Sequence, residues 1–315
     1  MSAAAIATLR RNTMLAEPLP WLVLTASALL LLGVVMIASA SMDMAAATMG
    51  NSYHYAIRQL IFAGIGCTLA LAAANVPISW WEGSGWLLLG AGLLSLILVL
   101  TPLGLTVNGS TRWIPLGLFN VQVSEVAKLC LIAYLAGYVV RRRDELVNSW
   151  WGFIKPVLVL GLASALLVIQ PDFGATVVLM TAALGMIFLS GVRLSRFMPL
   201  IGICVALGAV LIITQPYRLK RVVSYLDPWQ DQFNTGYQLT QSLIAFGRGD
   251  WTGVGLGNSI QKLFYLPEAH TDFIFAITAE EFGLLGSMTV LMLFTTMVLT
   301  GFVIARKAEK QGMAF

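Results

Sequence analysis

The chain has 315 residues, of which 58% are hydrophobic and 11% are charged, and its formal net charge is +4. Soluble domains carry about 25% charged residues, so this composition excludes a water-soluble fold. The excess positive charge gathers in a few short connections between apolar segments, where anionic lipid headgroups attract it, so it does not indicate a nucleic-acid partner.

Apolar blocks follow one another along the chain and predict its helices. Most hold about 18 to 22 residues, enough to cross a hydrocarbon core of roughly 30 Å as an α-helix. There are eight, at about 21–40, 57–76, 86–103, 121–140, 156–170, 174–190, 197–214 and 273–305. We therefore predict an all-α, polytopic helical membrane protein with eight transmembrane helices in a single integral membrane domain over residues 1–315.

The basic residues predict the orientation of these helices. If the eight spans alternate, one side receives Arg10 and Arg11, the run 141–143, Arg193 with Arg196, and the basic residues of 306–310. That side is the cytoplasm by the positive-inside rule, so residues 1–19 form a cytoplasmic tail and 215–271 a large extracytoplasmic loop. A cleavable signal peptide ending near 38–40 is the alternative, but an apolar run of about 19 residues is too long for one.

Two polar sets lie at predicted outer helix ends and leave two interpretations open. Arg58 begins the second block, where it either reaches toward headgroups or lines a polar cavity. Glu125 and Lys128 open the fourth block three residues apart, so they share a helix face and form either a structural ion pair or a cavity wall.

Two connections are also unusual. Arg112 is expected in a turn beside Trp113, after the third block. The break at 170–174, QPDFG, is either a tight turn capped by Asp172 or part of a site. The three cysteines, Cys67, Cys130 and Cys204, show no paired spacing and are expected to be free packing residues.

The long loop is close to neutral and rich in turns. Together with Asp272, which follows it, the loop carries five basic and five acidic residues. Its aromatic, glycine and proline content argues against disorder, and long ordered loops are usually functional. Gly253, Gly255 and Gly257 imitate part of a nucleotide fingerprint, but the required strand and helix are absent from the expected pattern, so we reject that interpretation.

One segment of the loop carries a specific resemblance. Residues 265–275 read YLPEAHTDFIF and are followed by EEFG at 280–283. This pattern resembles the SEDS family, the FtsW and RodA proteins of bacterial cell-wall synthesis. Agreement in order and place extends to NGSTRW at 108–113, QPDFG at 170–174, LDP at 226–228, GYQ at 236–238 and QS at 241–242. The wording AFGRG at 245–249 and PEAH at 267–270 is more similar to the division branch than to the elongation branch.

The resemblance implies an activity and a place in the cell. It implies a peptidoglycan glycosyltransferase that polymerises lipid II at the division septum, on the outer face of the bacterial inner membrane. The implied partners are a class B penicillin-binding protein of the FtsI type, other membrane proteins of the divisome and membrane lipids. Two departures stand out: Val123 replaces a common proline, and family members have ten helices, so the last two are expected to be absent from this chain.

The resemblance also implies site residues. Asp272 would be the catalytic base, at a junction of polar loop and apolar helix where we expect it to be partly withdrawn from water; the alternative is that Thr271 or Asp272 only caps the last helix. The residues expected to bind substrate are Arg58, Arg112, Glu125, Lys128, Arg218, Arg221, Glu268 and His270. A divalent cation, Mg²⁺ or Mn²⁺, could help the arginines bind the diphosphate, although no acidic cluster in the sequence requires one. Glu280 and Glu281 differ by about 100° around a helix, so they cannot share a face and stay outside the predicted site.

Two other classes of function remain open at this point. A flippase or transporter of the lipid-linked precursor would also bury charges in a helical bundle, but it should show an internal repeat and a site at mid-membrane. A non-catalytic division scaffold would need only helices and tails, and it gives no reason for the motif around Asp272. The three hypotheses predict different outcomes for Asp272→Ala: loss of polymerisation, unchanged transport, or unchanged recruitment.

Overall fold

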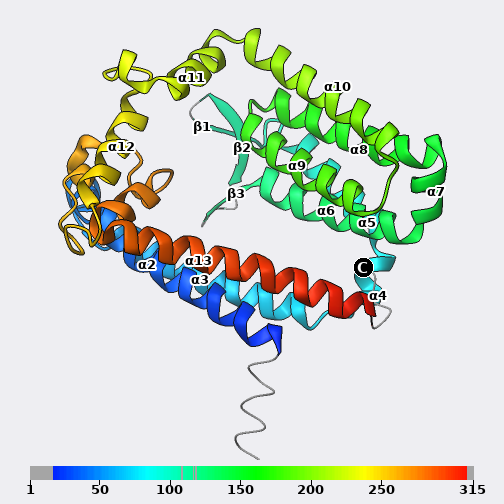
Figure 1. Cartoon of the computed structure of the whole chain (residues 1–315), viewed down its shortest axis with the longest axis horizontal. Helices are drawn as coiled ribbons and strands as arrows, with labels where there is room; N and C mark the ends of the chain where they lie inside the picture. Colours follow the sequence, from blue (N-terminus) through cyan, green and yellow to red (C-terminus); the bar gives the residue numbers. More distant parts are fainter. Residues whose placement is uncertain (1–16, 108, 116, 118, 311–315) are drawn as a thin grey trace, which may run out of the picture. The chain divides into compact units, whose positions relative to one another are not determined.

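The computed structural model describes residues 17–107, 109–115, 117 and 119–310, so the expectations for Arg10, Arg11 and Asn108 lie outside the described residues. The chain forms two compact units, one joining Met1–Leu71 to Ala209–Met313 and the other built around Ala72–Gly208. Figure 1 shows the helices and strands with their labels.

The first unit is organised around two long helices. Helix α2 (Pro18–Met49) packs along α13 (Ile274–Lys310), as Figure 1 shows in blue and red. The unit also contains α3 (His54–Ala74), α11 (Pro216–Leu226), the 3-10 turn η1 (Pro228–Asp231), α12 (Tyr237–Gly249) and the π-type turn η2 (Gln261–Tyr265). Its core joins Met36 and Ala40 of α2 to Ala276 and Ile277 of α13.

The second unit is a helical bundle with one small sheet. Its elements are α4 (Ile78–Gly83), α5 (Gly85–Leu98), α6 (Val123–Arg141), α7 (Arg143–Asn148), α8 (Trp150–Ile169), α9 (Phe173–Leu189) and most of α10 (Leu194–Ile213). Helix α6 packs against α5 and α9. Leu96, Leu131, Leu167 and Leu179 are fully buried among these helices.

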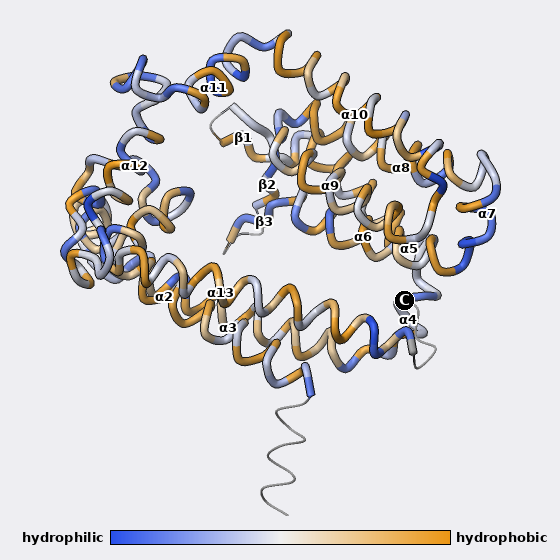
Figure 2. Tube along the Cα trace, in the orientation of Figure 1, coloured by the Kyte–Doolittle hydropathy of each residue, from blue (hydrophilic) through white to orange (hydrophobic). Residues whose placement is uncertain are grey.

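A helix lies at each of the predicted apolar blocks, with shifted ends. Among the described residues, α2, α3, α6, α8, α10 and α13 are long and apolar enough to cross a membrane, while α5 and α9 are apolar but shorter. Figure 2 shows hydrophobic residues along α2 and α13 and more hydrophilic ones around α7. Large apolar side chains such as Leu31 and Leu129 point outward from their helices, as expected where lipid surrounds a bundle.

A three-stranded antiparallel sheet is an addition to the expected all-helical fold. Its strands are β1 (Leu105–Val107), β2 (Ser110–Pro115) and β3 (Asn120–Gln122), in the order β1-β2-β3. Arg112 therefore lies in strand β2, so the expectation that it lies in a turn is wrong. The strands have only three to six residues, which is too short for a period-2 pattern to show in the sequence.

Helix α13 is interrupted at Gly283, whose φ is 67° and ψ is −161°. A loop segment, residues 250–255, replaces the helical hydrogen bonds that are lost at the break. Four backbone bonds do this: Leu284 N to Asp250 O (2.8 Å), Leu285 N to Trp251 O (3.1 Å), Val254 N to Glu280 O (3.0 Å) and Gly255 N to Glu281 O (3.0 Å). The loop is thus inserted into the hydrogen-bond ladder of α13, which fixes the loop to the helix through backbone geometry.

Candidate functional site

The motif segment 265–273 forms a turn anchored on two buried residues. Leu266 and Ala269 are each 1% exposed and lie in the core shared by α2 and α13. The amides of Thr271 and Phe273 both donate to the Glu268 carbonyl at 3.2 Å. The Thr271 hydroxyl donates to the Glu268 carboxylate at 2.6 Å. The turn therefore has a fixed backbone just before α13 begins.

Asp272 lies on the outside of this turn. It is exposed in its unit, so the expectation that it is partly withdrawn from water is wrong for this unit, because the turn buries Ala269 and directs Asp272 outward. Among the residues described, neither Asp272 nor Thr271 makes a side-chain capping bond to α13, and Asp272 has no ion-pair partner.

His270 belongs to the same turn, and Arg58 belongs to α3. The His270 ring stacks on Tyr55, with ring centroids 4.7 Å apart. Its Nδ1 atom is buried and has no partner among the described residues. Arg58 lies one helical turn after Tyr55, exposed, with its guanidinium 5.6 Å from the Phe62 ring.

Helix α11 carries Arg218 and Arg221. Arg218 donates to the Leu211 carbonyl at 3.1 Å, which ties α11 to the end of α10. The Arg221 guanidinium lies 4.6 Å over the Tyr217 ring. Both arginines belong to the same unit as Asp272, Glu268, His270 and Arg58. Farther along the loop, hydrogen bonds from Asn234 and Thr235 hold the pKa of the Asp231 carboxyl below its usual value. These bonds connect residues 231, 234 and 235 of the loop.

Two glutamates outside the predicted site are fully buried in α13. Glu280 accepts from Ser259 Oγ, from Ile260 N at 3.1 Å and from Gln261 N at 3.3 Å. Arg248 lies 3.6 Å from the same carboxylate. The two glutamates do point to different sides of α13, as the angular argument required, but the loop supplies partners on both sides. The signal for this in the sequence was an adjacent pair of carboxylates inside an apolar helix, just before a glycine.

In the second unit, Glu125 and Lys128 form the ion pair that their spacing predicts. Lys128 Nζ lies 2.8 Å from Glu125 Oε1 in the first turns of α6. The Lys128 side chain is 16% exposed and that of Glu125 is 59% exposed. The pair is therefore open to solvent on one side, and both interpretations of it, structural pair and cavity wall, remain compatible with its geometry.

The Asp172 carboxylate joins the break between α8 and α9 to the small sheet. It caps α9 by accepting from Ala175 N at 3.1 Å, as the turn interpretation predicted. Arg112 of β2 lies 3.9 Å from the same oxygen, and Ser110 of β2 donates to the Gln170 carbonyl at 2.6 Å. Asp172 Oδ2 and Arg112 Nε are buried without partners among the described residues, so this group has hydrogen-bonding capacity left over.

The two units hold different parts of the predicted site. The first unit contains Asp272, Glu268, His270, Arg58, Arg218 and Arg221, and the second contains Arg112, Glu125 and Lys128. Within the described part of the chain, no group of three or more His, Cys, Asp or Glu could hold a metal ion. The cysteines are free as predicted; Cys67, however, is exposed and does not pack in its unit.

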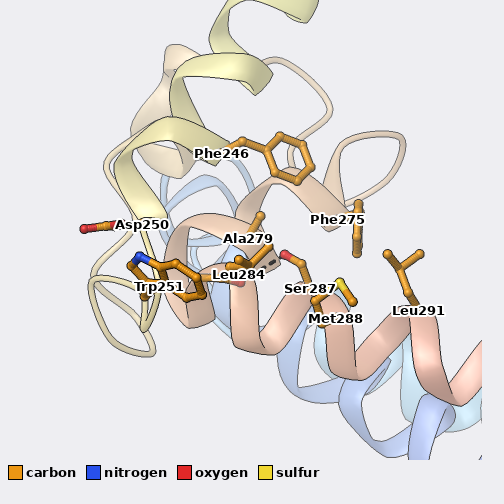
Figure 3. Close-up of a pocket in the computed structure, with 10 residues that line it drawn as sticks. Phe246, Asp250, Trp251, Phe275, Ala279, Leu284, Ser287, Met288 and Leu291 are labelled. Carbon is orange, nitrogen blue, oxygen red and sulfur yellow. Dashed lines mark hydrogen bonds between the residues drawn. The ribbon is translucent and has the colours of Figure 1, made fainter.

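A pocket of about 430 Å³ opens beside the break in α13. Figure 3 shows Phe246 of α12 above Phe275, Ser287 and Met288 of α13. The Ser287 hydroxyl donates to the Gly283 carbonyl at 3.0 Å, one helical turn back in α13. The lining is mostly apolar, so the pocket suits hydrocarbon better than a charged group.

Comparisons with known proteins agree with these observations. The FtsW, RodA and SpoVE family, described as cell cycle protein, matches residues 20–315. A "probable peptidoglycan glycosyltransferase FtsW" of Marinobacter nauticus is 78% identical over 299 residues, covering 95% of this chain and 75% of that protein. Its namesake from Hahella chejuensis is 53% identical over 316 residues, covering 100% and 79%.

Solved structures show the same similarity. A chain from a peptidoglycan synthase complex, described as structurally coordinating polymerization and crosslinking, aligns with a TM-score of 0.68 at 27% identity, covering 90% of this chain and 77% of that one. A mutant of the rod shape determining protein RodA of Thermus thermophilus, with one aspartate replaced by alanine, aligns with a TM-score of 0.63 at 25% identity, covering 91% and 74%.

Proposed function

The chain belongs to the FtsW, RodA and SpoVE family, and from this membership we propose that it is a peptidoglycan glycosyltransferase of the bacterial inner membrane. It polymerises lipid II, a disaccharide-pentapeptide on undecaprenyl pyrophosphate, into glycan strands of the division septum. The observation that carries the proposal is the carboxylate of Asp272, which is exposed and has no ion-pair partner among the described residues. It lies on a fixed turn formed by the motif that this chain shares with the family.

Asp272 is the general base of the proposed reaction. It takes the proton from the acceptor sugar hydroxyl while that oxygen attacks the anomeric carbon of the donor and pyrophosphate departs. Because pyrophosphate is already a good leaving group, one carboxylate suffices. A positioned base of this kind contributes about 10² to 10⁴ in rate. The fixed turn supports the assignment, since a base must be held in place to act.

The diphosphate of the donor needs cations. Arg58, Arg218 and Arg221 are the candidates in the unit of Asp272, and arginine suits bidentate contact with phosphate oxygens. In the other unit the candidates are Arg112 and Lys128, with Glu125 orienting the lysine. Glu268 and His270 are expected to contact the sugars, because they precede Asp272 on the same turn.

A divalent cation, Mg²⁺ or Mn²⁺, is a further proposal. Mg²⁺ commonly binds through one or two carboxylates together with substrate phosphates. The residues that the structure describes offer no larger cluster of ligands, so the diphosphate itself would supply most of the coordination.

The partner and the location follow the same reasoning. The solved structure of a peptidoglycan synthase complex supports a class B penicillin-binding protein as the partner that crosslinks the strands. Other divisome membrane proteins, a septal location and a cytoplasmic amino terminus remain part of the proposal. An outer-face loop, residues 215–271, would place Asp272 where lipid II is available after its transfer across the membrane.

The test is glycan-strand formation from purified lipid II in detergent, with the cognate penicillin-binding protein present. We expect polymer from the unmodified protein and none from Asp272→Ala or Asp272→Asn. Asp43→Asn is the matched control, because Asp43 is an exposed carboxylate in the same unit outside the site; it should polymerise normally.

Other outcomes point elsewhere. If both Asp272 variants polymerise normally while folded and bound to the partner, Asp272 is not the base. If the unmodified protein makes no polymer, the flippase and scaffold hypotheses come forward. Transport of a labelled precursor across vesicles and recruitment of division proteins in cells would then separate those two.

A further inference from the structure

A lysine and a glutamate form an ion pair in the interior of the first unit. Lys262 Nζ lies 2.9 Å from Glu281 Oε1, and the two side chains are 5% and 0% exposed. Ser39 of α2 completes a triangle: its hydroxyl donates to both Glu281 oxygens at 2.7 and 2.8 Å. The ammonium of Lys262 also lies 3.1 Å from Ser39 Oγ. Three elements, α2, η2 and α13, meet at this point, and α2 is far from the other two in the chain.

Such an arrangement is costly to assemble. Each charge loses several kcal/mol of hydration when it is buried, and the attraction offsets this only where geometry is good and the remaining lone pairs are satisfied. Apolar side chains would hold three segments together without that cost, but hydrophobic contacts have no direction. Charged hydrogen bonds do have direction. The pair therefore fixes the orientation of η2 on the two long helices more narrowly than packing alone would.

The same turn is held at its start by the adjacent residue of α13. Glu280 accepts from the hydroxyl of Ser259 and from the amides of residues 260 and 261. Consecutive carboxylates thus hold residues 259–262 from two sides. On the opposite edge, the carbonyls of Glu280 and Glu281 accept from residues 254 and 255. Residues 280–281 are the point at which both loop segments are fixed to α13.

A short series of backbone hydrogen bonds and buried side chains connects Lys262 to the turn that carries Asp272. The amide of Leu266 donates to the Gln261 carbonyl at 2.9 Å, closing η2 immediately around Lys262. Leu266 then enters the core, followed by Ala269, and the Glu268 carbonyl fixes the amide of Phe273. Among the described residues, none of the charged groups in this series contacts Asp272.

We propose that Lys262 and Glu281, joined through Ser39, are positioning residues that hold the turn bearing Asp272 in its reactive orientation. The proposal rests on the proposed function for the role of Asp272. Neither residue contacts substrate, so the pair affects the orientation of the base and not the affinity for lipid II. Loss of the pair therefore lowers kcat and leaves KM nearly unchanged.

The experiment uses the full protein with its partner and compares four changes. The singles are Lys262→Met and Glu281→Gln; the double variant Lys262→Met with Glu281→Met replaces both charges by apolar groups of similar size. The reversed pair, Lys262→Glu with Glu281→Lys, restores opposite charges. The matched control is Lys307→Met with Glu17→Met, because these residues form an exposed ion pair of the same type at 3.4 Å in the same unit.

Three quantities are measured: kcat and KM for lipid II, the melting temperature, and amide hydrogen exchange of residues 261–273 in the absence of substrate. We expect the single variants to lose kcat by about tenfold to a hundredfold, the range for a base displaced by about 1 Å. Exchange of residues 261–273 should rise in the same variants. The double Met variant should regain the melting temperature but not kcat, and the control pair should change none of the three quantities.

The result that overturns the proposal is a double Met variant with normal melting temperature, normal exchange and normal kcat, because the pair would then serve stability alone. Where a single variant fails to fold, the double and reversed variants decide. If the unmodified protein makes no polymer, the proposed function fails. The exchange measurement then still decides whether the pair holds the turn, with unchanged exchange in the double variant refuting it.

Discussion

At the scale of single residues, Asp172 combines two interactions that substitution can separate. Its carboxylate caps α9 through Ala175 N and lies 3.9 Å from Arg112. Asparagine caps a helix about as well as aspartate, whereas alanine loses roughly 1 kcal/mol. Asp172→Asn therefore removes the charge facing Arg112 and keeps the cap, while Asp172→Ala removes both.

We expect Asp172→Ala to be less stable than Asp172→Asn by about 1 kcal/mol in the free energy of unfolding, measured by denaturant titration in detergent. If Asp172 also orients Arg112 for the diphosphate, both variants should raise KM for lipid II to a similar extent. Equal stability of the two variants would show that the cap contributes little. A KM that stays normal in both would remove Arg112 from the proposed site.

The candidate site was partly predictable from residue spacing. Glu125 and Lys128 pair as their three-residue separation required, because spacing within one helix determines which side chains meet. The partners of Glu281 could not be found in this way. Lys262 precedes Glu281 by 19 residues and Ser39 precedes it by 242 residues, so their meeting depends on how α2 and the loop pack on α13, which no local pattern records.

At the scale of elements, the break in α13 depends on Gly283. Its φ of 67° and ψ of −161° fall in a region that only glycine adopts readily, and holding another residue there costs of order 1–3 kcal/mol. A Cβ at this position would also overlap Gly253 N and the Trp251 backbone. The loop can be inserted into α13 only because both segments have a glycine where they cross, Gly253 in the loop and Gly283 in the helix.

We expect Gly283→Ala to expel residues 250–255 from α13 and to lower the free energy of unfolding by about 1–3 kcal/mol. Hydrogen exchange of the amides of residues 254 and 255 should then rise sharply. Gly301→Ala is the control, because the space around Gly301 in α13 is open and alanine favours a helix. Unchanged exchange at residues 254 and 255 in Gly283→Ala would contradict the insertion.

The elements themselves were predicted unevenly. The helices agree with the apolar blocks to within a few residues at most ends, because lipid forces each span to be long, apolar and helical. Helix α2 is the exception: it continues to Met49, nine residues beyond the predicted end, since residues 41–49 are good helix formers but are not a lipid-length apolar run. The sheet was missed because strands of three to six residues leave no periodic signal.

At the scale of the whole molecule, charge distribution predicts the side of each connection. Basic residues in short connections favour the cytoplasm. The connection between α6 and α8 contains the run 141–143, and the loop between α10 and α13 carries balanced charge. Alternation of the spans then places Asn148 inside and Leu256 outside. Both side chains are exposed within their units, so each position can report its side of the membrane.

The measurement is labelling of single cysteines with a membrane-impermeant maleimide in spheroplasts, after Cys67, Cys130 and Cys204 are replaced by alanine. We expect Leu256→Cys to be labelled in intact spheroplasts and Asn148→Cys only after the membrane is permeabilised, because the proposed role of Asp272 in lipid II polymerisation requires the loop to face outward. The cysteine-free chain gives the background. Labelling of Asn148→Cys alone in intact spheroplasts would show the opposite orientation, with Asp272 on the cytoplasmic side. Asp272 could not extend a glycan strand outside the cell from there, so this result would contradict its proposed role.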